Sequence, residues 1–123
     1  MNGVLWILQF LLAVTFAASG LLKATQTKER MIAIGQTGVT PFPLPVIRAV
    51  AATELLAALG LILPWASGVA PALTPLAAVG VGLIMVGAAA SHWSLHEYKQ
   101  VFGVNLVLLG LAAVVAIGRF AEL

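Results

Sequence analysis

The feature that most constrains this sequence is the length of its stretches without charge. Residues 2–22, 55–96 and 100–118 contain no Asp, Glu, Lys or Arg. A helix needs about 20 mostly apolar residues to cross the hydrocarbon core of a bilayer. Only 8% of the 123 residues are charged, whereas a soluble domain needs about 25% to cover its surface. The sequence therefore predicts an integral membrane protein whose outer surface is solvated by lipid.

The middle stretch is long enough for two spans and has to be divided. Pro64, Trp65, Gly68 and Pro71 lie near its centre, and such a cluster is typical of a turn between helices with the Trp at the membrane interface. We therefore predict an all-α, integral membrane four-helix transmembrane bundle that forms a single domain. The expected spans are residues 3–22, 46–63, 72–91 and 101–118.

The connection between the first two spans is the longest. Thr27 is a suitable N-cap for a short interfacial helix over residues 27–36. Pro41, Pro43 and Pro45 exclude a continuous helix after it. Because long connections are often functional, this segment is either a plain interfacial loop or a lid over a site.

Basic residues indicate an orientation. Arg119 lies on the side of the chain termini, whereas the other five basic residues lie on the side of the first and third connections. Cytoplasmic loops carry an excess of Lys and Arg. We therefore expect an inner (plasma) membrane protein with both termini outside the cytoplasm.

Composition also restricts the classes of partner and chemistry. The sequence has no Cys, which excludes disulfides, thiolate nucleophiles and cysteine-bound iron–sulfur clusters. Six basic residues spread along the chain do not form the basic face that binds nucleic acid. Small residues at positions 13 and 17 and at 78 and 82 allow close helix packing, either within the bundle or across a homodimer.

Glu54 is the strongest candidate functional residue. It is expected near the middle of the membrane, where an ionisable side chain costs about 2.5 kcal/mol or more and usually faces the bundle interior. It either stays protonated or pairs with a cation. Its role is then that of a proton carrier or ligand-binding group, or that of a neutral side chain hydrogen-bonded to another helix.

Other polar residues are expected in the same half of the bilayer and come from all four helices. Ser19 and Lys23 share one helix face because they are four positions apart. Arg48 does not share the face of Glu54, so it reaches inward or extends to the headgroups. Gln9, in the opposite half, is expected to bond a neighbouring helix. The predicted ligand-binding residues are Ser19, Lys23, Arg48, Glu54, His92 and Asn105.

His92 and His96 have the spacing of a helical metal chelate, but the signal is weak. The HExxH order is absent and no third ligand is apparent. Trp93 and Tyr98 beside them are typical of an interfacial aromatic belt. We therefore predict no metal site here.

Taken together, these features resemble the DoxX-like family of small four-helix membrane proteins. The resemblance rests on the motif of residues 18–23 (ASGLLK), Arg48, the Thr53-Glu54-Leu55 motif, residues 58–64 (ALGLILP), and His92 and Asn105 at the ends of the last two spans. It implies a membrane subunit related to that of a thiosulfate:quinone oxidoreductase, although most members have no defined activity.

Three functions remain open on this basis. The first is a redox-associated subunit, non-catalytic by itself, that binds a quinone-like or other lipophilic molecule and works with a redox partner protein. The second is a small proton-coupled transporter. Small multidrug transporters also have four helices and an essential membrane Glu, but theirs lies in the first helix and Glu54 is expected in the second. The third is a structural or assembly factor for a larger membrane complex.

Overall fold

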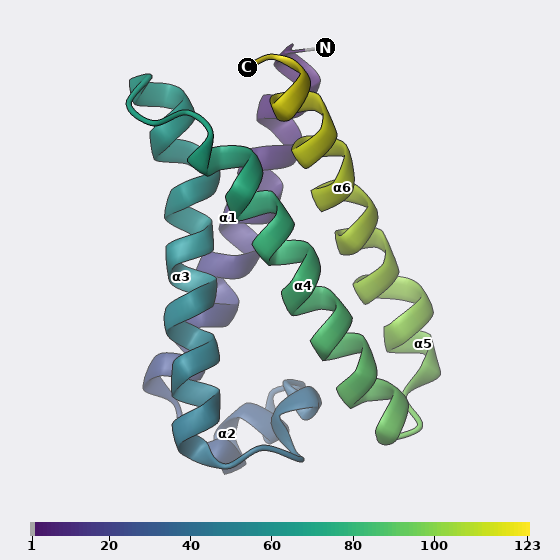
Figure 1. Ribbon diagram of the computed structural model, residues 1–123. Helices are drawn as coiled ribbons and strands as arrows, with labels where there is room; N and C mark the ends of the chain where they lie inside the picture. Colours follow the sequence, from purple (N-terminus) through teal and green to yellow (C-terminus); the bar gives the residue numbers. More distant parts are fainter. Residues whose placement is uncertain (1) are drawn as a thin grey trace.

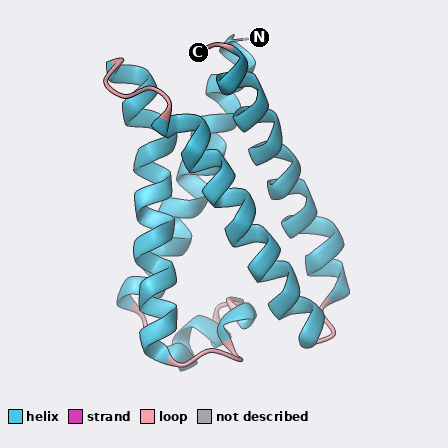
Figure 2. Cartoon of the chain, in the orientation of Figure 1, coloured by secondary structure: helices cyan, strands magenta, loops and turns pink. Residues whose placement is uncertain are grey.

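The computed structural model describes residues 2–123, which form a bundle of long helices without strands (Figures 1 and 2). The long helices are α1 (Asn2–Thr25), α3 (Leu44–Ser67), α4 (Leu73–Ser94) and a continuous last helix. This last helix consists of α5 (Tyr98–Gln100), the π-helical turn η2 (Val101–Asn105) and α6 (Leu106–Ala121). In the described part of the chain, four helices are long and apolar enough to span a membrane. The predicted all-α four-helix membrane bundle is confirmed.

The helices form a ring in which α1 packs against α3 and α6, and α4 packs against the same two helices. Both termini and the α3–α4 turn lie at one end, hereafter the terminal end (Figure 1). The short helices α2 (Lys28–Ala33) and η1 (Thr37–Val39) and the α4–α5 turn lie at the opposite end, hereafter the loop end (Figure 1). Lys23, Arg48, His92 and Asn105 lie near the helix ends that meet there, so these four predicted residues are in the half of the bundle nearest the loop end.

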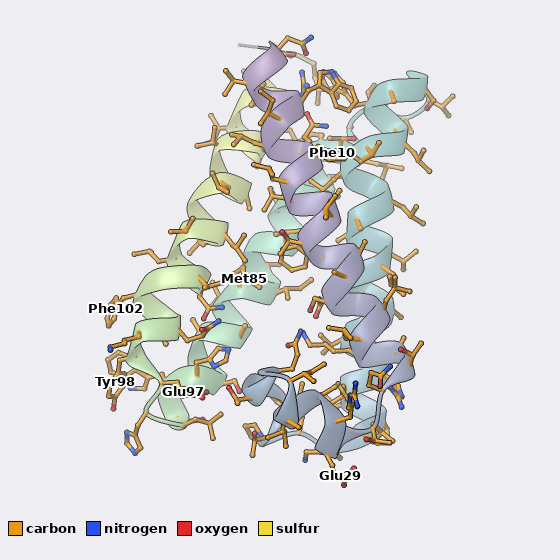
Figure 3. All side chains as sticks on the ribbon, turned by 180° about the vertical axis from the view of Figure 1, so that it is seen from behind. Phe10, Glu29, Met85, Glu97, Tyr98 and Phe102 are labelled. Carbon is orange, nitrogen blue, oxygen red and sulfur yellow. The ribbon has the colours of Figure 1, made fainter. Side chains whose placement is uncertain are left out.

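The centre of the bundle is apolar, and so is most of its outer surface. Leu12, Phe16, Leu61, Val81 and Val115 belong to one buried cluster. Large apolar side chains also cover the outside, and Phe102 is shown projecting from the bundle in Figure 3. Apolar residues on both faces are what a lipid-solvated bundle requires.

The expected end of the second span at residue 63 is wrong, because α3 continues through Pro64 to Ser67. Proline has no N–H, so it leaves the carbonyl of Gly60 without its helical donor. The hydroxyl of Thr74 in α4 donates to that carbonyl at 2.8 Å. The helix ends instead at Gly68, whose positive φ of 75° is the left-handed conformation favoured by glycine.

The other helix bounds differ at their ends. The first and third spans run on to Thr25 and Ser94, and the last helix begins at Tyr98. The interfacial helix is shorter than expected, but its N-cap is Thr27, whose hydroxyl accepts a bond from the Arg30 N–H at 3.1 Å. Pro45 does not interrupt α3, because it lies in the first turn, where its missing N–H has no helical partner.

A polar cluster closes the terminal end around Arg119, which is fully buried. Its guanidinium donates to the Gln9 side chain at 2.6 Å, to the Asn2 side chain at 2.7 Å and to Glu122 at 2.8 Å. The rings of Trp6 and Trp65 lie 5.4 and 4.5 Å from its central carbon, within cation–π range.

Gln9 also donates to the carbonyl of Leu61 at 2.6 Å. It therefore joins α1 to α3 and α6, as expected of an interhelical bond. The small residues are likewise used inside the bundle, since Ala13 and Ala78 are in the core and a Cβ on Gly82 would be 3.4 Å from Leu109.

Candidate functional site

A cavity of about 220 Å³ lies at the loop end, between α1, η1, α3 and α4. It is larger than the roughly 150 Å³ apolar cavity that accommodates a benzene molecule in another protein. Its walls are mostly aliphatic, with a few polar side chains contributed by α1, α4 and the segment before η1. The polar lining residues are Lys23, Gln36, Ser91 and His92.

Lys23 forms a buried ion pair with Glu54. Its ammonium lies 2.5 Å from Oε1 of Glu54 and 3.1 Å from the Ser19 hydroxyl. Glu54 is 1% exposed and Lys23 16% exposed. The second Glu54 oxygen, Oε2, is buried without a hydrogen-bond partner among the described residues. Of the two possibilities for Glu54, the structure shows the pairing with a cation.

The Arg48 side chain bonds the backbone of Lys23 and so helps to position the ion pair. Its Nη1 donates to the carbonyl of Lys23 at 2.5 Å, in the last turn of α1. The last carbonyls of a helix have no helical donors, and an Arg side chain can satisfy them. Arg48 therefore neither contacts Glu54 nor simply extends to the headgroups, but fixes the end of α1 where Lys23 lies.

His92, on the α4 side of the cavity, is held by the way α4 ends. The Glu97 N–H donates to the His92 carbonyl at 2.8 Å, and the His96 N–H donates to the Trp93 carbonyl at 3.0 Å. This is the Schellman pattern, with His96 in the left-handed position at a φ of 61°. The pattern brings Glu97 back over His92, whose Nδ1 lies 2.8 Å from Oε1 of Glu97.

The segment containing η1 closes the cavity at the loop end. The Ser91 hydroxyl donates to the Gly38 carbonyl at 2.5 Å, and the Thr37 hydroxyl donates to both oxygens of Glu97, at 3.0 and 2.8 Å. A Cβ on Gly38 would lie 3.0 Å from Nε2 of His92. Glycine at position 38 therefore lets the backbone rest directly against the imidazole.

The bonds from His92 and Thr37 hold the pKa of Glu97 below its ordinary value of 4.5, with the His92 bond the larger cause. A carboxyl whose pKa is lowered by folding stabilises the folded state above its unfolded pKa. That stabilisation is lost as the pH falls through the lowered value. We expect protease cleavage in residues 36–42 to increase below pH 4.5 in the wild type. In Glu97→Gln the cleavage should be fast at all pH values, and a wild-type rate independent of pH would contradict this.

Asn105 does not line the cavity but contacts Met85, which does. It ends the π-helical turn η2, is buried, and donates from Nδ2 to the sulfur of Met85 at 3.7 Å. Its Oδ1 is buried without a partner among the described residues. Met85 lines the cavity, so Asn105 contacts a wall residue rather than the cavity itself. Met85 and Glu97 are labelled in Figure 3, on the α4 side of the bundle.

The predicted site residues thus fall into three groups. Ser19, Lys23 and Glu54 are joined by direct bonds, and Arg48 bonds the backbone of that group. His92 lines the same cavity as Lys23 from α4. Asn105 is separated from them by Met85.

Two further residues of this region were not predicted, Gln36 and Glu97. Gln36 lines the cavity and donates to the Ser19 hydroxyl at 3.5 Å. A His followed five positions later by Glu at the end of a helix is the signal that points to the His92–Glu97 contact. The Nδ1 of His96 lies 2.7 Å from the Tyr98 hydroxyl, and residues 2–123 contain no group of three or more ligands suited to a metal ion.

The model of the DoxX-like family matches residues 7–115. Neither the curated proteins nor the solved structures contain a match.

Proposed function

The chain belongs to the DoxX-like family, and on that premise we propose that it is a redox-associated membrane subunit that binds a quinone-like lipophilic molecule. The observation that carries the proposal is the loop-end cavity. It combines aliphatic walls with a lysine ammonium and an imidazole at its polar end. Apolar pockets with a few convergent polar groups are typical small-molecule sites.

The residues present fit a quinone head group. Its ring would pack against the aliphatic side chains, and its carbonyl oxygens are hydrogen-bond acceptors. Lys23 offers an ammonium that Glu54 and Ser19 hold at the cavity wall. The Gln36 amide is a further donor in the lining. When bound, a quinone accepts two electrons and two protons.

His92 is suited to move protons at this site. With Nδ1 bonded to the Glu97 carboxylate, a neutral ring keeps its proton on Nδ1 and leaves Nε2 as an acceptor. A protonated ring donates from Nε2 instead. Glu97 lies in the turn between α4 and α5, outside the membrane-spanning segments, so it can exchange protons with water. The sequence contains no Cys, and in this proposal the electrons come from a partner redox protein.

Ligand-induced stabilisation tests the proposal. A ligand present at 100 times its Kd raises the free energy of unfolding by about 2.7 kcal/mol. We expect a quinone to raise the unfolding midpoint of the purified protein. His92→Asn should abolish the effect, because asparagine keeps a polar group near the Nδ1 position but removes Nε2. His96→Asn is the matched control, since asparagine tolerates the left-handed backbone. A wild-type protein that no quinone stabilises would refute the proposal.

We further propose that the loop end faces the cytoplasm, in the plasma membrane. Lys23, Lys28, Arg30, Arg48 and Lys99 are at that end, and Arg119 is at the terminal end. Because the chain has no Cys, a single cysteine reports the side unambiguously. We expect Ser67→Cys to react with an impermeant maleimide added to intact cells and Lys99→Cys to react only after lysis. The reverse pattern would invert the orientation.

A further inference from the structure

We propose that the loop-end cavity opens sideways into the membrane between α3 and α4, and that its ligand is a membrane-dissolved quinone whose apolar chain leaves through this opening. The inference rests on the proposed function and specifies the class of quinone. A water-soluble quinone would need a route from the aqueous side, whereas the geometry of the cavity favours entry from the lipid.

The two helices are held together at the terminal end. A Cβ on Gly60 of α3 would lie 2.9 Å from the Cβ of Ala77 in α4, so the backbones are already as close as they can be. The Thr74 hydroxyl bonds the Gly60 carbonyl at the same place. From this junction α3 and α4 diverge toward the loop end, as Figure 1 shows. The cavity lies in the divergent half.

Residues that line the cavity are also exposed on the outside of the bundle. Val46 of α3 is 40% exposed, and Gly87 of α4 is exposed as well. A residue that both lines a cavity and faces the exterior marks its opening. Gly87 lies seven residues before the end of α4 at Ser94, which is about 10 Å at 1.5 Å per residue. The opening therefore reaches into the apolar part of the span.

The connecting segment covers the aqueous side of the cavity except beside Phe42, which precedes α3, lines the cavity and is 39% exposed. Gln36, Gly38 and Val39 line the cavity from the loop end, and Val39 is 4% exposed. The bonds from Ser91 to Gly38 and from Thr37 to Glu97 hold this segment against α4. An apolar chain attached to a head group beside Lys23 and His92 is thus directed between the helices, where aliphatic side chains and lipid replace water.

Gly87 provides a sharp test of this opening. A Cβ built on it meets no atom within 4 Å, so a side chain can begin at this position without displacing a neighbouring atom. Gly80 has the same open surroundings on the same helix, two turns away, but does not line the cavity. A leucine at position 87 places its side chain in the opening, while a leucine at position 80 only adds to the lipid-facing surface.

The experiment compares two ligands in lipid nanodiscs, a benzoquinone with a ten-carbon chain and the same quinone without the chain. We expect Gly87→Leu to weaken binding of the chain-bearing quinone at least about tenfold, since it displaces several methylene groups from the opening. Binding of the chainless quinone should change less than about twofold, and Gly80→Leu should change neither.

Each alternative result has a distinct meaning. Equal weakening of both quinones by Gly87→Leu, or of the chain-bearing quinone by Gly80→Leu, would overturn the lateral opening and leave the quinone site in place. Failure of the wild type to bind either quinone would overturn the proposed function itself. Val46→Phe, on the facing edge of α3, gives the same comparison if Gly87→Leu does not fold.

Discussion

Replacing Lys23 with methionine is expected to destabilise the protein by about 3–5 kcal/mol, the cost of leaving one member of a buried ion pair without its partner. Glu54 is 1% exposed, and its Oε2 already has no partner in the described chain. Without Lys23 both of its oxygens would lack a donor. The free energy of unfolding in detergent measures the loss, and Lys99→Met, at an exposed position, is the control for removing a loop-end charge.

The double variant Lys23→Met/Glu54→Leu is expected to be more stable than Lys23→Met, and within about 1 kcal/mol of the wild type. Burying two apolar side chains avoids the desolvation of both charges, so replacing such a pair is often neutral or favourable. Glu54→Leu alone should cost less than Lys23→Met, because Lys23 borders the cavity and can turn its ammonium into it. Additive effects of the two substitutions would show that the pair is not coupled.

The same double variant separates stability from binding. It should fold, yet it lacks the ammonium that the proposed function assigns to the quinone carbonyl. We therefore expect the quinone to stop stabilising this variant. Retained stabilisation would mean that Lys23 and Glu54 serve only the packing of α1 against α3.

The second large effect is expected at the opposite end of the bundle. Arg119→Met should destabilise the protein by about 3 kcal/mol or more, because hydrogen bonds to a charged group contribute about 1.5–3 kcal/mol each. Two of them, to Gln9 and Asn2, are lost together with the cation–π contacts to the two Trp rings. The Glu122 carboxylate is 36% exposed, so that ion pair adds little.

Arg119→Lys and Arg30→Ala complete this comparison. Lysine keeps the charge but has no planar fork, so it cannot reach Gln9 and Asn2 at once while stacking on the Trp rings. We expect it to recover less than half of the loss. Arg30 is exposed on α2, and its truncation should change the unfolding free energy by less than about 0.5 kcal/mol. Equal effects for Arg119→Met and Arg30→Ala would show that the terminal cluster does not stabilise the bundle.

Sequence patterns predict those parts of the fold that are determined by the apolar environment of the membrane. The charge-free stretches predict the spans, because the cost of burying a charge in hydrocarbon excludes Lys, Arg, Asp and Glu from most positions. The same cost singles out Glu54 and indicates that a cation such as Lys23 lies nearby. The helix faces that bring these two residues together follow from packing, which periodicity does not reveal in a chain that is apolar on every side.

Each departure from the sequence-based prediction has a physical cause. Pro64 removes one helical donor and its ring crowds the carbonyl of Gly60. The Thr74 hydroxyl that bonds this carbonyl comes from another helix. The sequence does not indicate the role of Glu97, because its contact with His92 depends on a Schellman turn in which His96 occupies the place usual for glycine. Gln36 reaches the cavity through the fold of the connecting segment. A tertiary partner thus decides the fate of Pro64 and the position of Gln36, whereas the His92–Glu97 contact depends on a local turn that the residue type at position 96 does not indicate.

The bond between Thr74 and Gly60 has a consequence for how the protein is made. A free carbonyl is costly in hydrocarbon, and the donor that relieves α3 of this cost belongs to α4. The α3 helix therefore reaches its lowest energy in lipid only once α4 has joined it. We therefore expect α3 and α4 to enter the membrane together as a hairpin, with its turn at Gly68, rather than as separate helices.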